Sequence, residues 1–210
     1  MDKVISKIFI ILNRPISEKW FIPIGLIVLS LIMCLAWLMD WKEVLYVKNG
    51  WVTMKFQTAL AFVFLGVQIL FKLLKWYKLS SWFGGMLFIS CIWTVTGFLL
   101  DNPINFLPHF EENNMHFESV RGDMPSWATL FCFTTASIAI EWEKFSKIFI
   151  YSSAILAGLP IFSYLIDPVI SVPQLRYYIP NFSTAMAFHT AIFIIHVVLW
   201  VQVYGYAKKG

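Results

Sequence analysis

The sequence predicts an all-α, polytopic membrane protein whose six transmembrane helices form three repeated helical hairpins. Of its 210 residues, 59% are hydrophobic and 13% are charged, and the mean hydropathy is +0.71, unlike the composition of a soluble domain. The hydrophobic residues lie in long blocks instead of at the period of an amphipathic helix or a half-buried strand. A pattern of block endings and openings also recurs at steps of roughly 60 to 70 residues, which indicates an internal repeat.

Each block is expected to be one span. A helix needs roughly 20 apolar residues to cross a hydrocarbon core about 30 Å thick. Lipid offers no hydrogen-bond partner to the backbone, so each block must be helical. In chain order, the six predicted spans are 20–39, 55–71, 82–100, 125–140, 148–166 and 186–203.

The three predicted hairpins have similar sequences at the end of their first block and at the start of their second block. The first block ends in leucine, an apolar residue and aspartate, at Asp40, Asp101 and Asp167. The second block opens with a related segment, which reads MKFQTALAF from Met54, MPSWATLFCF from Met124 and MAFHTAIFI from Met186. The turns that join one hairpin to the next are short, which favours antiparallel neighbours. Residues 20–205 are therefore predicted to form one membrane domain, with hairpins at about 20–72, 82–141 and 147–205.

Basic residues predict the orientation. In the lead of residues 1–19, apolar residues separate Lys3, Lys7, Arg14 and Lys19, a pattern typical of a short helix on an anionic leaflet. Positive residues gather on the cytoplasmic side of membrane proteins. With the lead in the cytoplasm, eleven of the sixteen lysines and arginines lie on that side. Both termini are thus predicted to be cytoplasmic, and the net charge of +4 reflects topology and not binding to nucleic acid.

The repeated aspartates are candidate ligand-binding residues. Asp40, Asp101 and Asp167 end the first helix of each hairpin, where the helix dipole disfavours a carboxylate by up to ~1 kcal/mol. The second helix of each hairpin begins on the same face and offers free amides, so each aspartate could simply cap its neighbour. The functional alternative is a ring of three carboxylates at the outer mouth that binds a cation or a basic ligand.

The repeated threonines are the next candidates. Thr58, Thr129 and Thr190 lie about one turn inside the second helix of each hairpin, and each is next to an alanine. Small and hydroxylated residues let membrane helices approach closely and bond across the contact. The residues are therefore expected to form a packing seam or, alternatively, to line a polar cavity.

Two histidines lie within the last predicted span. His189 and His196 are seven residues apart and share a helix face. A haem would need an opposing ligand, and the other predicted spans contain no histidine, so hydrogen-bonded interior histidines are the simpler interpretation. Ionisable residues in a membrane are candidate functional residues in any case. His109, His116 and nearby carboxylates in the second outer connection match no standard metal-binding spacing, so the identity of any metal or cofactor stays open.

The remaining sequence features argue against catalysis and coupled transport. None of the six spans carries Asp, Glu, Lys or Arg between its boundary residues, although proton-coupled carriers usually need such a group. The sequence contains no nucleophile elbow, phosphate-binding loop, HExxH or CxxC motif. Cys34, Cys91 and Cys132 all fall in spans and are expected to be small packing residues. The protein is therefore predicted not to be an enzyme.

The hairpin openings resemble the N-terminal membrane regions of bacterial sensor proteins, in particular PAS-containing histidine kinases and cyclic-nucleotide-signalling enzymes. Those regions repeat openings of the form M-S-x-x-T-A-L-x-F, with a last copy close to M-x-x-H-T-A. The matching residues are Met54, Thr58, Ala59, Leu60 and Phe62, then Met124, Pro125, Trp127 and Leu130, then Met186, His189, Thr190 and Ala191. The second copy reverses the Thr-Ala order. The resemblance covers about residues 20–205 and implies a sensory membrane module.

These observations predict a non-enzymatic protein of the bacterial inner membrane, either a sensory or ligand-binding module or an accessory subunit of a membrane complex. No kinase, cyclase or PAS sequence follows Tyr206, so the resemblance implies that a partner carries the output. The expected partners are the lipid bilayer and a membrane or cytoplasmic protein, or further copies of the chain. The alternative is a small carrier, channel or membrane redox subunit, which would need a water-filled path or a cofactor between the second helices of the hairpins.

Overall fold

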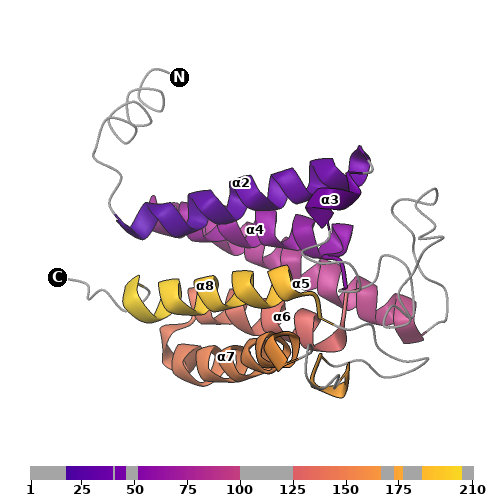
Figure 1. Ribbon diagram of the computed structural model, residues 1–210. Coiled ribbons are helices and arrows are strands. Elements are labelled where there is room, and N and C mark those ends of the chain that lie inside the picture. Colours follow the sequence, from indigo (N-terminus) through magenta and orange to yellow (C-terminus); the bar gives the residue numbers. More distant parts are fainter. Residues whose placement is uncertain are drawn as a thin grey trace.

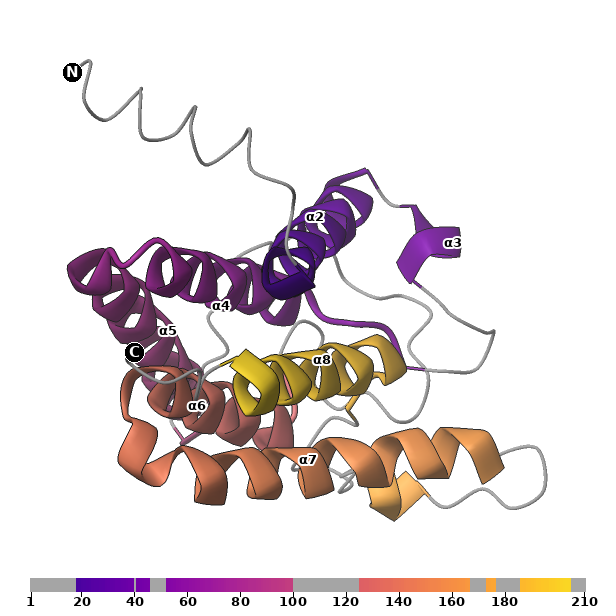
Figure 2. The same cartoon turned by 90° about the vertical axis from the view of Figure 1, so that its left-hand side faces the viewer.

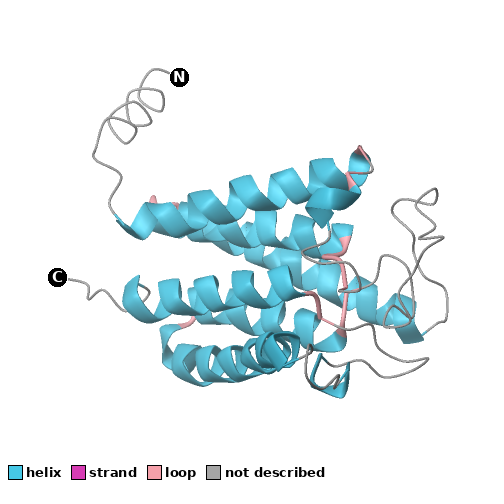
Figure 3. Ribbon diagram, in the orientation of Figure 1, coloured by secondary structure: helices cyan, strands magenta, loops and turns pink. Residues whose placement is uncertain are grey.

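The computed structural model describes residues 18–39, 41–45, 52–99, 125–166, 173–176 and 186–204, and these residues form helices and no strand (Figures 1 and 3). Two short elements, α3 (Lys42–Leu45) and the 3₁₀ helix η1 (Pro173–Arg176), lie in the connections. The long helices are α2 (Glu18–Leu38), α4 (Phe56–Leu73), α5 (Tyr77–Leu99), α6 (Trp127–Glu141), α7 (Glu143–Ile166) and α8 (Phe188–Tyr204). The all-helical prediction is confirmed for these residues, and each predicted span corresponds to one long helix.

Four of the long helices can cross a membrane by length and composition: α2, α4, α5 and α7. The other two, α6 and α8, are apolar but contain only 15 and 17 residues. At 1.5 Å per residue they are about 22 and 26 Å long, shorter than a hydrocarbon core of about 30 Å. The structure therefore supports a helical protein suited to a membrane, with four helices long and apolar enough to cross it. Residues 1–17 of the basic lead lie outside the described residues.

The long helices pack in a circuit that follows the chain. Each contacts the next one in sequence, and α8 returns to contact α2 (Figure 2). The indole Nε1 of Trp200 in α8 donates a hydrogen bond of 2.8 Å to the carbonyl oxygen of Lys19, which places the end of α8 beside the start of α2. Inside the circuit, α6 also contacts α4 and α8. The second helix of each predicted hairpin therefore lies toward the centre of the bundle.

Aromatic rings fill the space where α4, α6 and α8 meet. Phe62 of α4 has no exposed surface. Its ring meets Phe133 of α6 edge-on, with 4.6 Å between centroids, and Phe193 of α8 edge-on, with 5.1 Å between centroids. Such edge-to-face pairs are favoured by the quadrupole of the ring. The bundle is thus closed by side-chain packing along its axis at the level of Phe62.

The outward faces of the bundle are apolar. On α7, Ile148, Tyr151, Ile155, Phe162 and Leu165 follow helical spacing, and each exposes more than half of its surface. The outward faces of α2 and α5 are similar, with Phe21 exposed by 74% and Ile89 by 65%. Soluble proteins rarely expose apolar patches of this extent, whereas helices that face lipid do.

Two of the predicted hairpins are closed by the same kind of hydrogen bond. In the first, Trp37 Nε1 donates to the carbonyl oxygen of Met54 at 2.7 Å. In the third, the Tyr164 hydroxyl donates to the carbonyl oxygen of Met186 at 3.1 Å. Each aromatic donor lies three residues before the repeated aspartate, and each acceptor is the repeated methionine. The second hairpin has Phe98 at this position and cannot form the bond through its side chain, and Met124 lies outside the described residues, so the threefold repeat stays a prediction.

The turn between α4 and α5 places a lysine in the left-handed region. Lys75 has φ of 62°, and the next amide, Trp76 N, donates to the carbonyl oxygen of Phe71 at 2.9 Å. This is the arrangement of a Schellman cap, in which the left-handed residue is usually glycine. The side chain of a lysine makes this conformation unfavourable by roughly 1 kcal/mol.

We expect Lys75→Gly to raise the free energy of unfolding by about 1 kcal/mol, because glycine adopts this backbone conformation without the steric cost. Thermal unfolding of the purified protein in detergent would measure the change. Lys78→Gly is the control, because Lys78 lies in the first turn of α5 and glycine lowers helix stability there. A loss of stability in Lys75→Gly would contradict this account of the turn.

Candidate ligand-binding pocket

The three aspartates of the predicted ring lie outside the described residues, namely Asp40, Asp101 and Asp167. The second outer connection, with His109 and His116, also lies outside them. The role of the ring in binding stays a prediction. Within the part of the chain that the structure describes, no group of three or more His, Cys, Asp or Glu side chains is placed to hold a metal ion.

The three repeated threonines are buried in helix packing. Thr58, Thr129 and Thr190 each expose 2% of their surface, near the starts of α4, α6 and α8. The backbone amide of Thr129 donates to the Ser126 hydroxyl at 3.1 Å, which caps the start of α6. All three are therefore buried residues, and none of them lines the pocket described below.

The two histidines of α8 have different surroundings. His189 is half-buried, and its Nδ1 atom is buried without a hydrogen-bond partner. His196 is exposed, and its Nδ1–H donates to the carbonyl oxygen of Ile192 in its own helix at 2.8 Å. The two histidines thus lie at different depths, His189 at the edge of the core and His196 on the outside of the bundle. The two side chains do not form one site.

A pocket of about 440 Å³ lies between α4, α5 and the start of α6. Its volume is within the range of small-molecule sites, which are mostly apolar clefts with a few placed polar groups. The lining residues are Phe56, Gln57, Leu60, Ala61, Phe64, Met86, Ile89, Ser90, Cys91, Trp93, Thr94, Pro125, Leu130 and Phe133. Ile89 and Trp93, on the outward face of α5, are exposed by 65% and 51%. The pocket therefore opens sideways through the apolar surface of the bundle.

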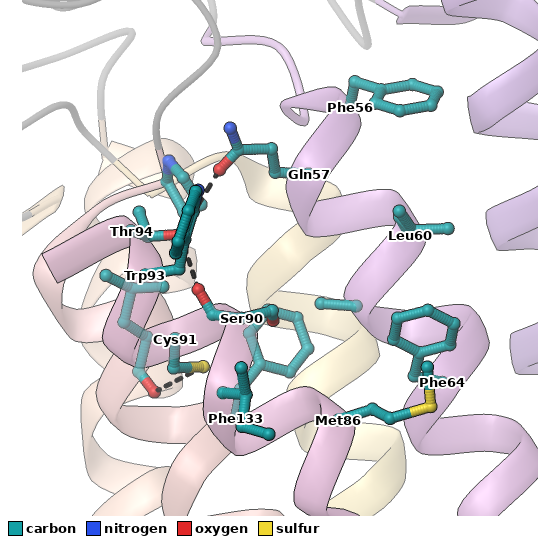
Figure 4. Close-up of a pocket in the computed structure, with 14 residues that line it drawn as sticks. Phe56, Gln57, Leu60, Phe64, Met86, Ser90, Cys91, Trp93, Thr94 and Phe133 are labelled. Carbon is teal, nitrogen blue, oxygen red and sulfur yellow. Dashed lines mark hydrogen bonds between the residues drawn. The ribbon is translucent and has the colours of Figure 1, made fainter. Parts of the chain in front are cut away.

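The polar groups of the pocket gather at one end. Figure 4 shows Gln57 and Thr94 facing each other there, with Phe64 and Met86 at the other end. The Thr94 hydroxyl donates to the carbonyl oxygen of Ser90 at 2.9 Å and lies 3.4 Å from Gln57 Oε1. The Ser90 hydroxyl donates to the carbonyl oxygen of Leu87 at 2.9 Å. None of the described lining residues is charged, so the pocket suits an uncharged molecule.

A second polar cluster joins α4, α5 and α6 at the opposite end of these helices. Oε1 of Glu141 accepts hydrogen bonds from Gln68 Nε2 at 3.2 Å and from the Ser80 hydroxyl at 2.7 Å. Oε2 accepts from the Ser81 hydroxyl at 3.0 Å and lies 3.7 Å from Lys72 Nζ. Gln68 and Ser80 have no exposed surface. The carboxylate therefore ties three helix ends together.

The charge of Glu141 is maintained by these contacts. Burial by itself raises the pKa of the carboxyl, but the hydrogen bonds from Ser80, Gln68 and Ser81 and the Lys72 ammonium together lower the pKa below its ordinary value of 4.5. Glu141 lies just beyond the predicted span 125–140, and we treat it as part of the helix end and not of the membrane-spanning segment. At neutral pH the group is ionised.

The cluster requires a glycine at position 84. A Cβ atom on Gly84 would lie 2.7 Å from Gln68 Nε2 and 3.0 Å from Ser137 Oγ, whereas a Cβ on Gly85 would meet nothing within 4 Å. We expect Gly84→Ala to lower the free energy of unfolding by about 1 to 3 kcal/mol through overpacking. The neighbouring Gly85→Ala is the control and should leave stability unchanged or raise it by up to about 1 kcal/mol. Thermal unfolding in detergent measures both, and equal effects would rule out the close approach at Gly84.

Arg176 is an interior residue that sequence reasoning missed. The predicted topology places it in the third outer connection, and η1 brings it against α7, where it exposes 1% of its surface. Its Nε donates to the Ser163 hydroxyl at 3.0 Å, and its guanidinium carbon lies 4.2 Å from the centre of the Tyr164 ring. Its carbonyl oxygen accepts from Met186 N at 2.8 Å. Arg176 thus anchors the third outer connection to α7 and to the start of α8.

The three cysteines agree with their predicted role. Cys34, Cys91 and Cys132 are free thiols that expose 8%, 5% and 0% of their surface, so they are packing residues. Cys91 also contributes to the wall of the pocket.

No family model, curated protein or solved structure matches this chain.

Proposed function

We propose that this chain is an integral membrane protein of six transmembrane helices that binds an apolar ligand from the bilayer and catalyses no reaction. The observation that carries the proposal is the pocket of about 440 Å³, which is lined by uncharged side chains and opens through an apolar outer face. A ligand dissolved in the hydrocarbon could enter between α4 and α5 without passing through water. A sensory module or an accessory subunit would use such a site to respond to the composition of the membrane.

The short helices α6 and α8 are compatible with six membrane passes. Ten of the fifteen residues of α6 are buried against neighbouring helices. Non-helical backbone at membrane depth is tolerated where protein, and not lipid, surrounds it. An inner helix enclosed by longer neighbours therefore does not need to match the full thickness of the hydrocarbon core.

The proposed setting is a bacterial inner membrane with both termini in the cytoplasm. The lysines at the ends and starts of the helices on that side support this orientation, namely Lys72, Lys75, Lys78, Lys144 and Lys147. This basic face would contact a membrane or cytoplasmic protein partner or a further copy of the chain.

The rival proposal is a carrier, channel or redox subunit. It requires a water-filled path or a cofactor between α4, α6 and α8. Packing of Phe62 against Phe133 and Phe193 fills the centre of that region with rings, which favours binding in the lateral pocket over passage along the axis.

The experiment is purification in mild detergent followed by mass spectrometry of the small molecules and proteins that copurify. We expect a stoichiometric apolar molecule that is lost in Ser90→Phe, which adds a ring to a lining residue, and retained in Ile92→Phe, an exposed α5 residue outside the lining. Equal retention by both variants would contradict the binding proposal. An absorbance spectrum with a Soret band would favour the redox rival, and a stoichiometric protein partner would favour the accessory-subunit form.

A further inference from the structure

The two ends of the pocket, which lie at different heights along the helices, differ in polarity. Gln57 lies in the first turn of α4, and Thr94 lies near the end of α5, so the polar end of the pocket is close to one end of both helices. Phe64 lies seven residues farther along α4, which corresponds to about 10 Å at 1.5 Å per residue. The apolar end, at Phe64 and Met86, is therefore nearer the middle of the bundle. This polarity matches a molecule with a small polar head and an apolar tail.

The hydrogen-bonding groups at the polar end of the pocket indicate which head group a ligand would have. The hydroxyl protons of Thr94 and Ser90 are donated to backbone carbonyl oxygens within α5. A hydroxyl group has one donor and two acceptor lone pairs, so these two side chains offer acceptors to a ligand. A head group that donates a hydrogen bond fits this arrangement. A carboxylate or phosphate fits less well: the amide of Gln57 carries N–H donors for an accepting head, but none of the described lining residues is charged, and burial of an uncompensated charge is strongly unfavourable.

We propose that the pocket binds a neutral amphiphile whose hydroxyl group donates a hydrogen bond to Thr94 and whose apolar tail extends about 10 Å toward Phe64 and Met86. The proposal rests on the proposed function and specifies the ligand class of the same site. The ligand enters from the hydrocarbon past Ile89 and Trp93, which form the exposed edge of the pocket.

The test uses the full chain in phosphatidylcholine nanodiscs and three ten-carbon probes brominated at mid-chain: the primary alcohol, its methyl ether and the carboxylate at pH 8. Bromine quenches tryptophan fluorescence at short range, and Trp93 lies at the pocket edge. We expect a saturable component of quenching for the alcohol that disappears in Trp93→Phe. The ether should bind about fivefold more weakly because it lacks the donor of one neutral hydrogen bond, and the carboxylate should bind at least about tenfold more weakly.

Two threonines of α5 provide a matched pair of variants. Thr94 and Thr96 each donate to a carbonyl oxygen four residues earlier at 2.9 Å, but only Thr94 lines the pocket. Thr94→Val should remove the fivefold preference for the alcohol over the ether, and Thr96→Val should keep it. Both substitutions lose the same kind of bond within the helix, so an effect of losing that bond would be common to both.

The outcomes separate the ligand class from the function. Equal binding of alcohol and ether, tighter binding of the carboxylate, or equal behaviour of the two threonine variants would overturn the proposed head group while leaving a binding pocket for apolar molecules. Strictly linear quenching by all three probes, unchanged in Ser90→Phe, would overturn both the ligand class and the proposed function.

Discussion

Replacement of Phe62 by alanine is expected to lower the free energy of unfolding by about 3 to 4 kcal/mol, the largest effect of any single substitution considered for this protein. The Phe62 side chain is fully buried and contacts rings from two other helices, at centroid distances of 4.6 and 5.1 Å. Its loss leaves a cavity between α4, α6 and α8 that these helices cannot close without moving their backbones. Thermal or denaturant unfolding of the purified protein in detergent would measure the loss.

The matched control is Phe131→Ala. Phe131 lies on α6, two residues before Phe133, but 49% of its surface is exposed. Removal of this exposed ring takes away few protein contacts and leaves no enclosed cavity, so stability should change by less than about 1 kcal/mol. A similar loss in both variants would mean that the three rings do not form a common core.

The helices of this protein could be predicted closely because their signal is the length of an apolar block. The predicted spans 55–71 and 186–203 differ from α4 and α8 by at most two residues at each end. The starts of α5 and α7 lie five residues earlier than predicted, at Tyr77 and Glu143. Those first turns are polar, and a block defined by apolar residues cannot detect a helix that continues beyond the hydrophobic region.

The pocket could not be predicted because its walls come from residues far apart in the chain. Gln57 and Thr94 are brought together only by the packing of α4 on α5. The repeat directed attention to Thr58, which is buried, whereas its neighbour Gln57 lines the pocket. Adjacent residues of a helix point about 100° apart, so a repeated packing position and a ligand-facing position can be consecutive.

The repeated openings do not identify the pocket either. Gln57, Trp127 and His189 each lie three residues after the repeated methionine, and this position differs in every copy. The position directly after the methionine differs as well, so variation alone does not mark a ligand-facing residue. The burial of Arg176 had no signal in the sequence, because a count of charges within the spans does not include a residue that a connection carries into the bundle.

Glu141→Ala is expected to lower the free energy of unfolding by about 2 to 3 kcal/mol at neutral pH. The side chain is 20% exposed and accepts hydrogen bonds from Gln68, Ser80 and Ser81. Its removal leaves the fully buried Ser80 hydroxyl without this acceptor, and hydrogen bonds to a charged group contribute more than neutral ones. Ser80→Ala should therefore cost more stability than Ser81→Ala, since the Ser81 bond is exposed to solvent. Equal effects of the two serine variants would contradict this description of the cluster.

The contribution of Glu141 should depend on pH with a defined sign. In the folded protein, the pKa of the Glu141 carboxyl lies below its ordinary value of 4.5. The unfolded chain therefore binds the proton more readily, and the stabilisation by Glu141 is fully present above pH 4.5. It is lost as the pH falls from 4.5 through the pKa of the folded state. Unfolding temperatures of the wild type and Glu141→Gln, measured from pH 7 to pH 3.5, should therefore converge in acid, because protonation makes the two side chains alike in charge. A stability difference that persists undiminished at pH 3.5 would show that the carboxylate charge is not what joins α4, α5 and α6.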